Sequence, residues 1–369
     1  MKIRLNIFRF EMGRTIVSED ISHTGNIFNI LRTIFATAVI FSHAFVLTGH
    51  IDPSTIMLPY SVSRFAVLLF FTLSGFLVTN SLQTRGVWQF ARARALRMLP
   101  GLWVMLLVSS AVATIAFGTF PLRSLPGNTS LWQYLFSNGL LIGRHYDIDG
   151  VFLGNPLPTI VNGALWTIPR EVQCYVALAL VGAVGLLNRP RVLLTCYIIG
   201  TCVHIMLPPD LVPALSALRP LVISFFAGVL MFLFRSKVYL SWQLAVLTIL
   251  LTIATDPGPL RELAAQLSAA YVALVIAFIV PSSWKRFSKT IPDYSFGIYI
   301  YGFPVQQAMI ATGFGITAGS NMLATLVCVV PMAALSWHLV EKPALARKDR
   351  RENSSQAAGT SSTPADSVR

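Results

Sequence analysis

Continuous apolar runs constrain this fold more than any other feature of the sequence. Residues 27–47 and 62–82 are examples, and a helix needs about 20 consecutive apolar residues to cross a bilayer. The mean hydropathy of the chain is +0.66, and charged residues make up only 12%, about half of their share in a soluble domain. The runs do not alternate with period two, which disfavours a β-barrel. We therefore expect an all-α, polytopic helical membrane protein.

Ten segments are predicted to be transmembrane helices. They cover residues 27–47, 62–82, 99–117, 164–187, 192–208, 218–234, 238–255, 263–281, 293–313 and 321–340. Residues 1–26 lack the apolar core of a cleavable signal peptide, so the first helix is expected to act as the targeting signal. Residues 344–369 are rich in Ser, Ala and Thr and are expected to be disordered. The chain is thus divided into an N-terminal segment (1–26), a membrane domain (27–343) and a tail.

The positions of the lysines and arginines orient these helices. If the N-terminus faces the cytoplasm, 21 of the 28 basic residues fall in cytoplasmic segments, as the positive-inside rule requires. The exceptions are Arg32, Arg64, Arg123, Arg144, Arg170, Arg219 and Arg261. The net charge of +13 is then a topology signal, which argues against nucleic-acid binding. Both termini are expected in the cytoplasm, and the long segment 118–163 outside, where Trp132 to Ile142 is too short to span the membrane.

Arg32 and His43 lie within the first predicted helix. They are eleven positions apart, so they return to within about 20° of one helical face and lie about 16 Å apart along the axis. Ionisable groups inside a span usually line a polar pathway or a reaction site, and histidine is suited to proton transfer near neutral pH. The alternative is a snorkelling arginine and a structural histidine.

Two further motifs follow along the chain. Ser74-Gly75 closes the second span, and its small residues favour close packing of helices. Arg94 and Arg97 are three positions apart, so they are neighbours on one helical face. Two guanidinium groups together suit a phosphate, and an ordinary cluster of inside-positive charge is the alternative.

Glu171 places a carboxylate just inside the membrane at the start of the fourth span. Its sequence neighbour Arg170 does not face it on a helix. We therefore expect Glu171 to have a partner on another helix, namely His43, Arg32 or Arg64, either for chemistry or as a structural interhelical pair.

Taken in order, these residues resemble the acyltransferase-3 family of membrane O-acyltransferases. The matching motifs are Arg32 with His43, Ser74 to Leu77, Arg94 and Arg97 with Pro100, Leu165 to Thr167 with Glu171 and Tyr175, Tyr294 and Ser295 with Tyr299, and Glu341 to Pro343. The chain departs from the family twice. Many members have a histidine after the late tyrosine block, where this chain has Tyr301-Gly302, and some carry a C-terminal extracytoplasmic hydrolase-like domain, for which residues 344–369 are too short.

The resemblance implies an acyltransferase domain over residues 27–343 in a bacterial inner membrane. It would transfer an acyl group, usually acetyl from acetyl-CoA, to a hydroxyl of exopolysaccharide, lipopolysaccharide or a related glycan, without a metal. The implied roles are general base for His43 with Glu171 as its orienting or charge-balancing partner, donor binding for Arg32, Arg94 and Arg97, and substrate binding for Trp166, Tyr175 and Tyr299. A transient acyl-histidine is a variant of this mechanism.

Two other classes of function remain open at the level of sequence. A secondary transporter or glycan exporter without acyl-transfer chemistry would also carry ionisable groups in its spans. A non-catalytic membrane scaffold is the third class, and the polar side chains inside the spans count against it.

Overall fold

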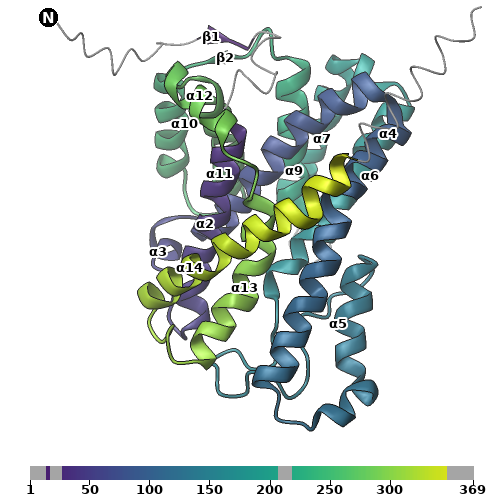
Figure 1. The fold of residues 1–369 in the computed structure, drawn as a ribbon. Coiled ribbons are helices and arrows are strands. Elements are labelled where there is room, and N and C mark those ends of the chain that lie inside the picture. The colour runs from purple at the N-terminus through teal and green to yellow at the C-terminus, as the bar shows by residue number, and fades with distance from the viewer. Residues whose placement is uncertain (1–13, 17–26, 207–217, 347–369) are drawn as a thin grey trace, which may run out of the picture.

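A computed structural model describes residues 14–16, 27–206 and 218–346, and this part of the chain is almost entirely helical (Figure 1). The predictions made for residues 1–13, 17–26, 207–217 and 347–369 lie outside the described residues. The elements are β1(Arg14–Thr15), α2(Phe28–Leu47), α3(Ser54–Met57), α4(Val62–Phe117), η1(Leu122–Gly127), α5(Thr129–Gly139), η2(Gly163–Trp166), α6(Thr167–Ala183), η3(Leu186–Asn188), α7(Pro190–Met206), α9(Leu218–Leu233), β2(Tyr239–Leu240), α10(Trp242–Ala254), α11(Pro259–Phe278), α12(Ser282–Thr290), α13(Ser295–Ala311), α14(Ala318–Ser336) and η5(Trp337–Glu341).

Each of the ten predicted spans overlaps a helix of the structure. Four helices among the described residues are both long enough and apolar enough to cross a membrane, namely α2, α4, α11 and α14 extended to Ala346. The helices α7, α9 and α10 are apolar but shorter. The second and third predicted spans both lie in α4, which bends at Gly86 with a φ of 75°. The chain thus has the character of a helical membrane protein.

The centre of the bundle is the crossing of α4 and α9. A Cβ atom added to Gly75 would lie 2.0 Å from the carbonyl oxygen of Phe225, and one added to Gly228 would lie 2.1 Å from that of Thr72. The Thr72 hydroxyl also donates a 3.2 Å hydrogen bond to the Ser224 carbonyl across the crossing. The backbones touch because neither glycine has a side chain, as the Ser74-Gly75 motif predicted.

Helix α13 packs between α2 and α14, and buried amide groups join the three. Gln306 donates 2.9 Å and 3.0 Å hydrogen bonds to the Ile40 carbonyl and to the Asn321 side chain. The adjacent Gln307 donates to the carbonyls of Leu157 and Ile160. Because buried amides are costly when unpaired, these bonds fix α13 against α2 and against the long segment 118–163.

The basic segments gather at one end of the bundle. Figure 1 shows β1, β2, α12 and the bend of α4 at the top, whereas α5 lies beside the lower part of α4. β1 pairs with β2, which follows the basic pair Arg235 and Lys237. Helix α5 covers most of the stretch that is too short to span, and it packs on α4 through a 2.9 Å hydrogen bond between Tyr134 and Ser109. It therefore forms part of the bundle near the end opposite the basic segments.

Candidate active site

One cavity brings together most of the residues singled out in the sequence. It lies where α2, both halves of α4, α6 and α13 meet. Its lining residues are Arg32, Val67, Phe70, Phe71, Ser74, Arg94, Arg97, Met98, Thr167, Ile168, Glu171, Tyr175, Ser295, Phe296 and Tyr299. Six of the eight predicted site residues are among them, and His43 and Trp166 are not. The cavity is thus a polar site inside an apolar bundle.

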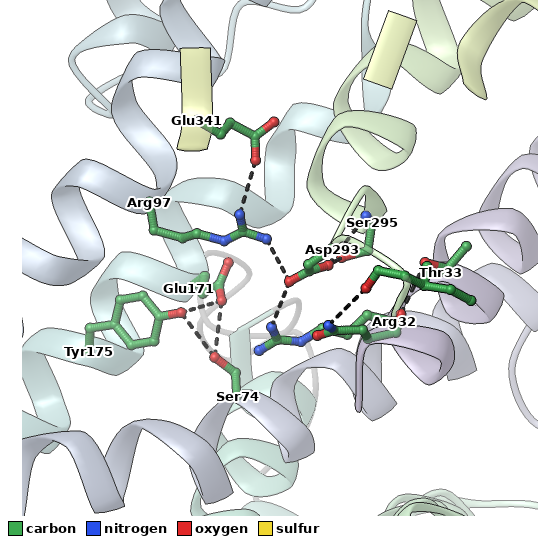
Figure 2. Close-up of polar contacts among 11 residues, drawn as sticks. Arg32, Thr33, Ser74, Arg97, Glu171, Tyr175, Asp293, Ser295 and Glu341 are labelled. Atoms are coloured by element: carbon green, nitrogen blue, oxygen red, sulfur yellow. Dashed lines mark hydrogen bonds and ion pairs between the residues drawn. The ribbon is translucent and has the colours of Figure 1, made fainter. Parts of the chain in front are cut away.

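Asp293 joins two of the cavity arginines. Its Oδ2 atom lies 3.1 Å from Nη1 of Arg32 and 2.6 Å from Nη2 of Arg97 (Figure 2). The other oxygen accepts hydrogen bonds from the backbone N–H and the hydroxyl of Ser295 at the start of α13. A carboxylate at a helix N-terminus is favoured by the unpaired N–H groups and the dipole. Asp293 therefore links the first turn of α13 to α2 and α4.

Arg97 is held from a second side by Glu341. The Glu341 Oε2 atom lies 3.1 Å from Nη1 of Arg97, and its side chain is only 1% exposed. Ser336 donates a 3.1 Å hydrogen bond to the other oxygen. Glu341 lies in the π-helical turn η5, and such turns often occur at functional sites. The Glu-Lys-Pro motif thus fixes the orientation of a cavity arginine.

Arg94 differs from the other two cavity arginines. It makes no ion pair or side-chain hydrogen bond with another residue in the described ranges, and its buried Nε atom has no partner. It lines the same cavity as Arg97, as their three-residue spacing predicted. Arg94 is therefore the cavity arginine best placed to take an incoming anion.

Glu171 does have a partner on another helix, but not one of the three that we expected. It accepts a 3.1 Å hydrogen bond from the Ser74 hydroxyl of α4 and a short one from the Tyr175 hydroxyl one turn along α6. Ser74 and Tyr175 are themselves 2.9 Å apart. The expectation of His43, Arg32 or Arg64 as partner was wrong because the fold sets the Ser74 hydroxyl beside the carboxylate (Figure 2).

Tyr299 closes one wall of the cavity. Its hydroxyl lies 2.7 Å from that of Thr167 and donates a 3.2 Å hydrogen bond to the Ala164 carbonyl. The neighbouring Trp166 packs against the hydrophobic core and does not line the cavity. Tyr299 also packs against the small apolar cluster that contains Phe303. It therefore connects the cavity to the next turn of α13.

His43 lies near that next turn, outside the cavity. Its ring is in edge contact with Phe303, with 5.5 Å between ring centroids, and the carboxylate of Asp52 is hydrogen-bonded to the preceding residue Ser42. Asp52 lies in the loop after α2 and accepts hydrogen bonds from Ser42 and Ser54. Burial raises the pKa of Asp52, but these hydrogen bonds and the nearby His43 outweigh it and leave the pKa below its usual value. Asp52 is therefore an anion beside His43 near neutral pH.

Sequence reasoning missed both Asp293 and Asp52. Asp293 is the only acidic residue between Glu262 and Glu341, so its rarity in an apolar region was an available signal. Asp52 lies five positions after the end of the first span, but nothing in its sequence neighbourhood indicates that the chain folds back onto Ser42. Only the fold brings these two carboxylates to their partners.

Comparison with known proteins gives three matches. A family model described as an acyltransferase domain matches residues 26–341. An O-acetyl transferase of Shigella phage Sf6 is 27% identical over 351 residues, which cover 88% of this chain and 97% of the relative. Nodulation protein 10 of Rhizobium leguminosarum bv. viciae is 28% identical over 355 residues, which cover 87% of this chain and 93% of the relative. No solved structure matches the chain.

Proposed function

Because this chain belongs to the acyltransferase-3 family, whose model covers residues 26–341, it is an acyltransferase, and we propose that it moves an acetyl group from acetyl-CoA to a carbohydrate hydroxyl. The observation that carries the proposal is the cavity lined by Arg32, Arg94 and Arg97 together with Glu171. A cavity with three guanidinium groups suits an anionic donor. The relative named as an O-acetyl transferase supports acetyl as the group and oxygen as the acceptor atom.

The donor phosphates bind at Arg94 in this proposal. Its guanidinium group is not engaged by a carboxylate of the described chain, whereas Arg32 and Arg97 are both held by Asp293. Arg32 and Arg97, which are paired with carboxylates, then form the wall behind the phosphates. The pantetheine arm separates the phosphates of coenzyme A from its thioester, so the acyl group can lie well away from Arg94, towards Tyr299.

His43 acts as the general base on the acceptor hydroxyl. It removes the hydroxyl proton while the oxygen attacks the thioester carbon, the new C–O ester bond forms, and the C–S bond breaks. The proton then passes from the imidazolium to the departing thiolate. Asp52 stabilises the imidazolium by its negative charge in this proposal, because its carboxylate is held close to His43 by a hydrogen bond from the preceding residue Ser42.

Glu171 has a positioning role in the proposal. Its hydrogen bonds with Ser74 and Tyr175 hold three polar groups on one wall of the cavity. Trp166 precedes Thr167, whose hydroxyl is hydrogen-bonded to that of Tyr299. Trp166 therefore supports the wall of the cavity that faces the acceptor. Together these residues shape the path between the donor and His43.

The donor enters from the cytoplasm and the acceptor from the opposite side of a bacterial inner membrane. The basic segments at one end of the bundle support this orientation (Figure 1). The acceptor is a glycan of the cell envelope, such as exopolysaccharide or lipopolysaccharide, which lies outside the cytoplasm. Segment 118–163 then forms part of the acceptor side.

The test compares glycan O-acetylation in cells with the protein, without it, and with Arg94→Ala. Mass spectrometry of the isolated envelope glycans gives the readout, and Arg191→Ala, which changes an exposed arginine at the start of α7, is the matched control. The proposal expects full acetylation with the wild type and the control, less acetylation with Arg94→Ala, and none without the protein. Equal acetylation without the protein, or with Arg94→Ala, would contradict it.

A further inference from the structure

Three arginines break the positive-inside pattern in a common way. Arg64, Arg219 and Arg261 lie in the first turns of α4, α9 and α11, respectively. A cation at a helix N-terminus opposes the helix dipole, whereas an anion there is favoured. The three positions therefore gain from a negatively charged partner.

Contacts along the three helices place these first turns at the same end of the bundle. Near the other end, Phe76 of α4 packs against Phe232 of α9 and Phe278 of α11, with ring centroids 5.4 Å and 5.6 Å apart. At the starting ends, Tyr60 donates a 3.0 Å hydrogen bond to Glu262 of α11. The helices thus run side by side in the same direction, and their starts lie opposite the end that carries β2.

Positive side chains outnumber negative ones among the described residues at the start of these three helices. Tyr60 bonds Glu262, and the Arg64 guanidinium lies over the Tyr60 ring at 5.4 Å from its centroid. Among the described residues, Arg64, Arg219 and Arg261 make no ion pair. Buried nitrogen atoms without a partner include Nε of Arg64, Nε of Arg261 and Nδ1 of His204. Within the part of the chain that the structure describes, the group therefore has three cations, one carboxylate and several donors that lack an acceptor.

An apolar groove between α7 and α9 begins at this group. It is lined by Leu193, Cys196, Tyr197, Gly200, Thr201, His204, Leu218, Arg219, Val222, Ile223 and Phe226. His204 lies near the end of α7 and Arg219 near the start of α9, so both lie at the same end of the groove. The rest of the lining is mainly apolar, and nearby Ile198, Ile199 and Val203 are about half exposed on the surface of α7. The groove thus opens towards the lipid.

We propose that this groove binds a lipid that carries a phosphate group. The apolar chain lies along α7 and α9, and the phosphate accepts hydrogen bonds from Arg219 and His204, with Arg64 and Arg261 adding positive potential. A free phosphate would leave the apolar groove unused, and an acidic peptide would have to enter the lipid-facing side of the bundle. The site is separate from the cavity that contains Arg94 and does not depend on the proposed donor.

Native mass spectrometry of the detergent-purified protein tests this site without any donor or acceptor. Farnesyl monophosphate, farnesol and inorganic phosphate are titrated separately against the wild type and the variants Arg219→Gln, Gly200→Leu, Arg94→Ala and Arg144→Gln. Loss of one charge-assisted contact is expected to weaken binding by about 10- to 100-fold. Gly200→Leu fills the groove without changing charge, because no atom lies within 4 Å of a Cβ added there.

The proposal expects farnesyl monophosphate to bind more tightly than farnesol or inorganic phosphate. Arg219→Gln and Gly200→Leu should both weaken binding, and Arg94→Ala and Arg144→Gln should not. Farnesol binding equally well would show that the groove takes any apolar chain, and inorganic phosphate binding equally well would show an anion site only. Loss in Arg94→Ala with retention in Arg219→Gln would move the phosphate to the cavity. Each of these three results would overturn the proposal.

Discussion

The Asp293 carboxylate lies 2.6 Å from the Arg97 guanidinium and 3.1 Å from that of Arg32, so it holds two cavity arginines at once. Asp293 is buried, and so is Glu341, the second partner of Arg97. Buried ion pairs are costly to break from one side only, because a charge is then left unpaired. This contact therefore distinguishes Arg32 and Arg97, which are paired with carboxylates, from Arg94, which makes no ion pair within the described ranges.

Arg94→Ala is expected to weaken acetyl-CoA binding by about 10- to 100-fold, because charge-assisted hydrogen bonds to phosphate are lost. Arg94→Lys should recover part of this loss, since lysine keeps the charge but not the bidentate geometry. Isothermal titration calorimetry with purified protein measures the affinity. The melting temperature should stay near that of the wild type. Wild-type affinity in both variants would place the phosphate site elsewhere.

Arg97→Ala is expected to destabilise the protein by about 3–5 kcal/mol, because Asp293 and Glu341 would lose their shared partner. Asp293→Asn should also be destabilising, and the double variant should cost less than the sum of the two changes. Unfolding in detergent, followed by tryptophan fluorescence, gives the three values. A strictly additive double variant would show that the two residues do not interact.

His43→Ala is expected to lower acetyl transfer by about 100- to 10,000-fold, because a general base is lost. Asp52→Asn should cause a smaller loss, since it removes only the charge that stabilises the imidazolium. Turnover is measured with radiolabelled acetyl-CoA at matched amounts of folded protein, and donor affinity should not change in either variant. Near-normal turnover in His43→Ala would remove it from the mechanism.

Gly75→Ala is expected to destabilise the bundle by about 3 kcal/mol or more, because the added Cβ atom would lie 2.0 Å from the Phe225 carbonyl oxygen and force α4 and α9 apart. Gly200→Ala is the matched control, since Gly200 lies within α7 with nothing within 4 Å of an added Cβ. Thermal unfolding in detergent compares the two. The control should keep or raise the melting temperature, and an unchanged Gly75→Ala would refute the close crossing.

Single cysteines at Ser124 and Lys289 are expected to react from opposite sides of the membrane. Both positions are exposed, and the basic charge pattern places 118–163 outside and α12 in the cytoplasm. An impermeant maleimide applied to intact cells, in a background without the four native cysteines, should label position 124 only. Labelling of position 289 alone would invert the orientation.

Much of the fold could be predicted from the sequence because membrane helices are encoded locally. A long apolar run is sufficient to define a helix. The separation of eleven positions between Arg32 and His43 predicts that they lie on one face of it. Arg94 and Arg97 were likewise placed together by helical spacing, and the order of the motifs indicated the family. The bend of α4 at Gly86 was not evident, since a single glycine does not reveal that two helices follow each other directly across a kink.

Pairing between distant charges was decided only by the tertiary structure. Asp293 and Arg32 are 261 positions apart, and Arg97 and Glu341 are 244 apart, so no local pattern connects them. Glu171 had several possible partners in sequence, and the Gly75–Gly228 crossing of α4 and α9 helps set Ser74 on the wall beside it. The sequence by itself determined the helical class, the membrane character and the shared face of Arg94 and Arg97. The packing of the helices determined which cavity arginines are paired with carboxylates and which one, Arg94, makes no ion pair with the residues that the structure describes, because an ion pair depends on distance in space and not along the chain.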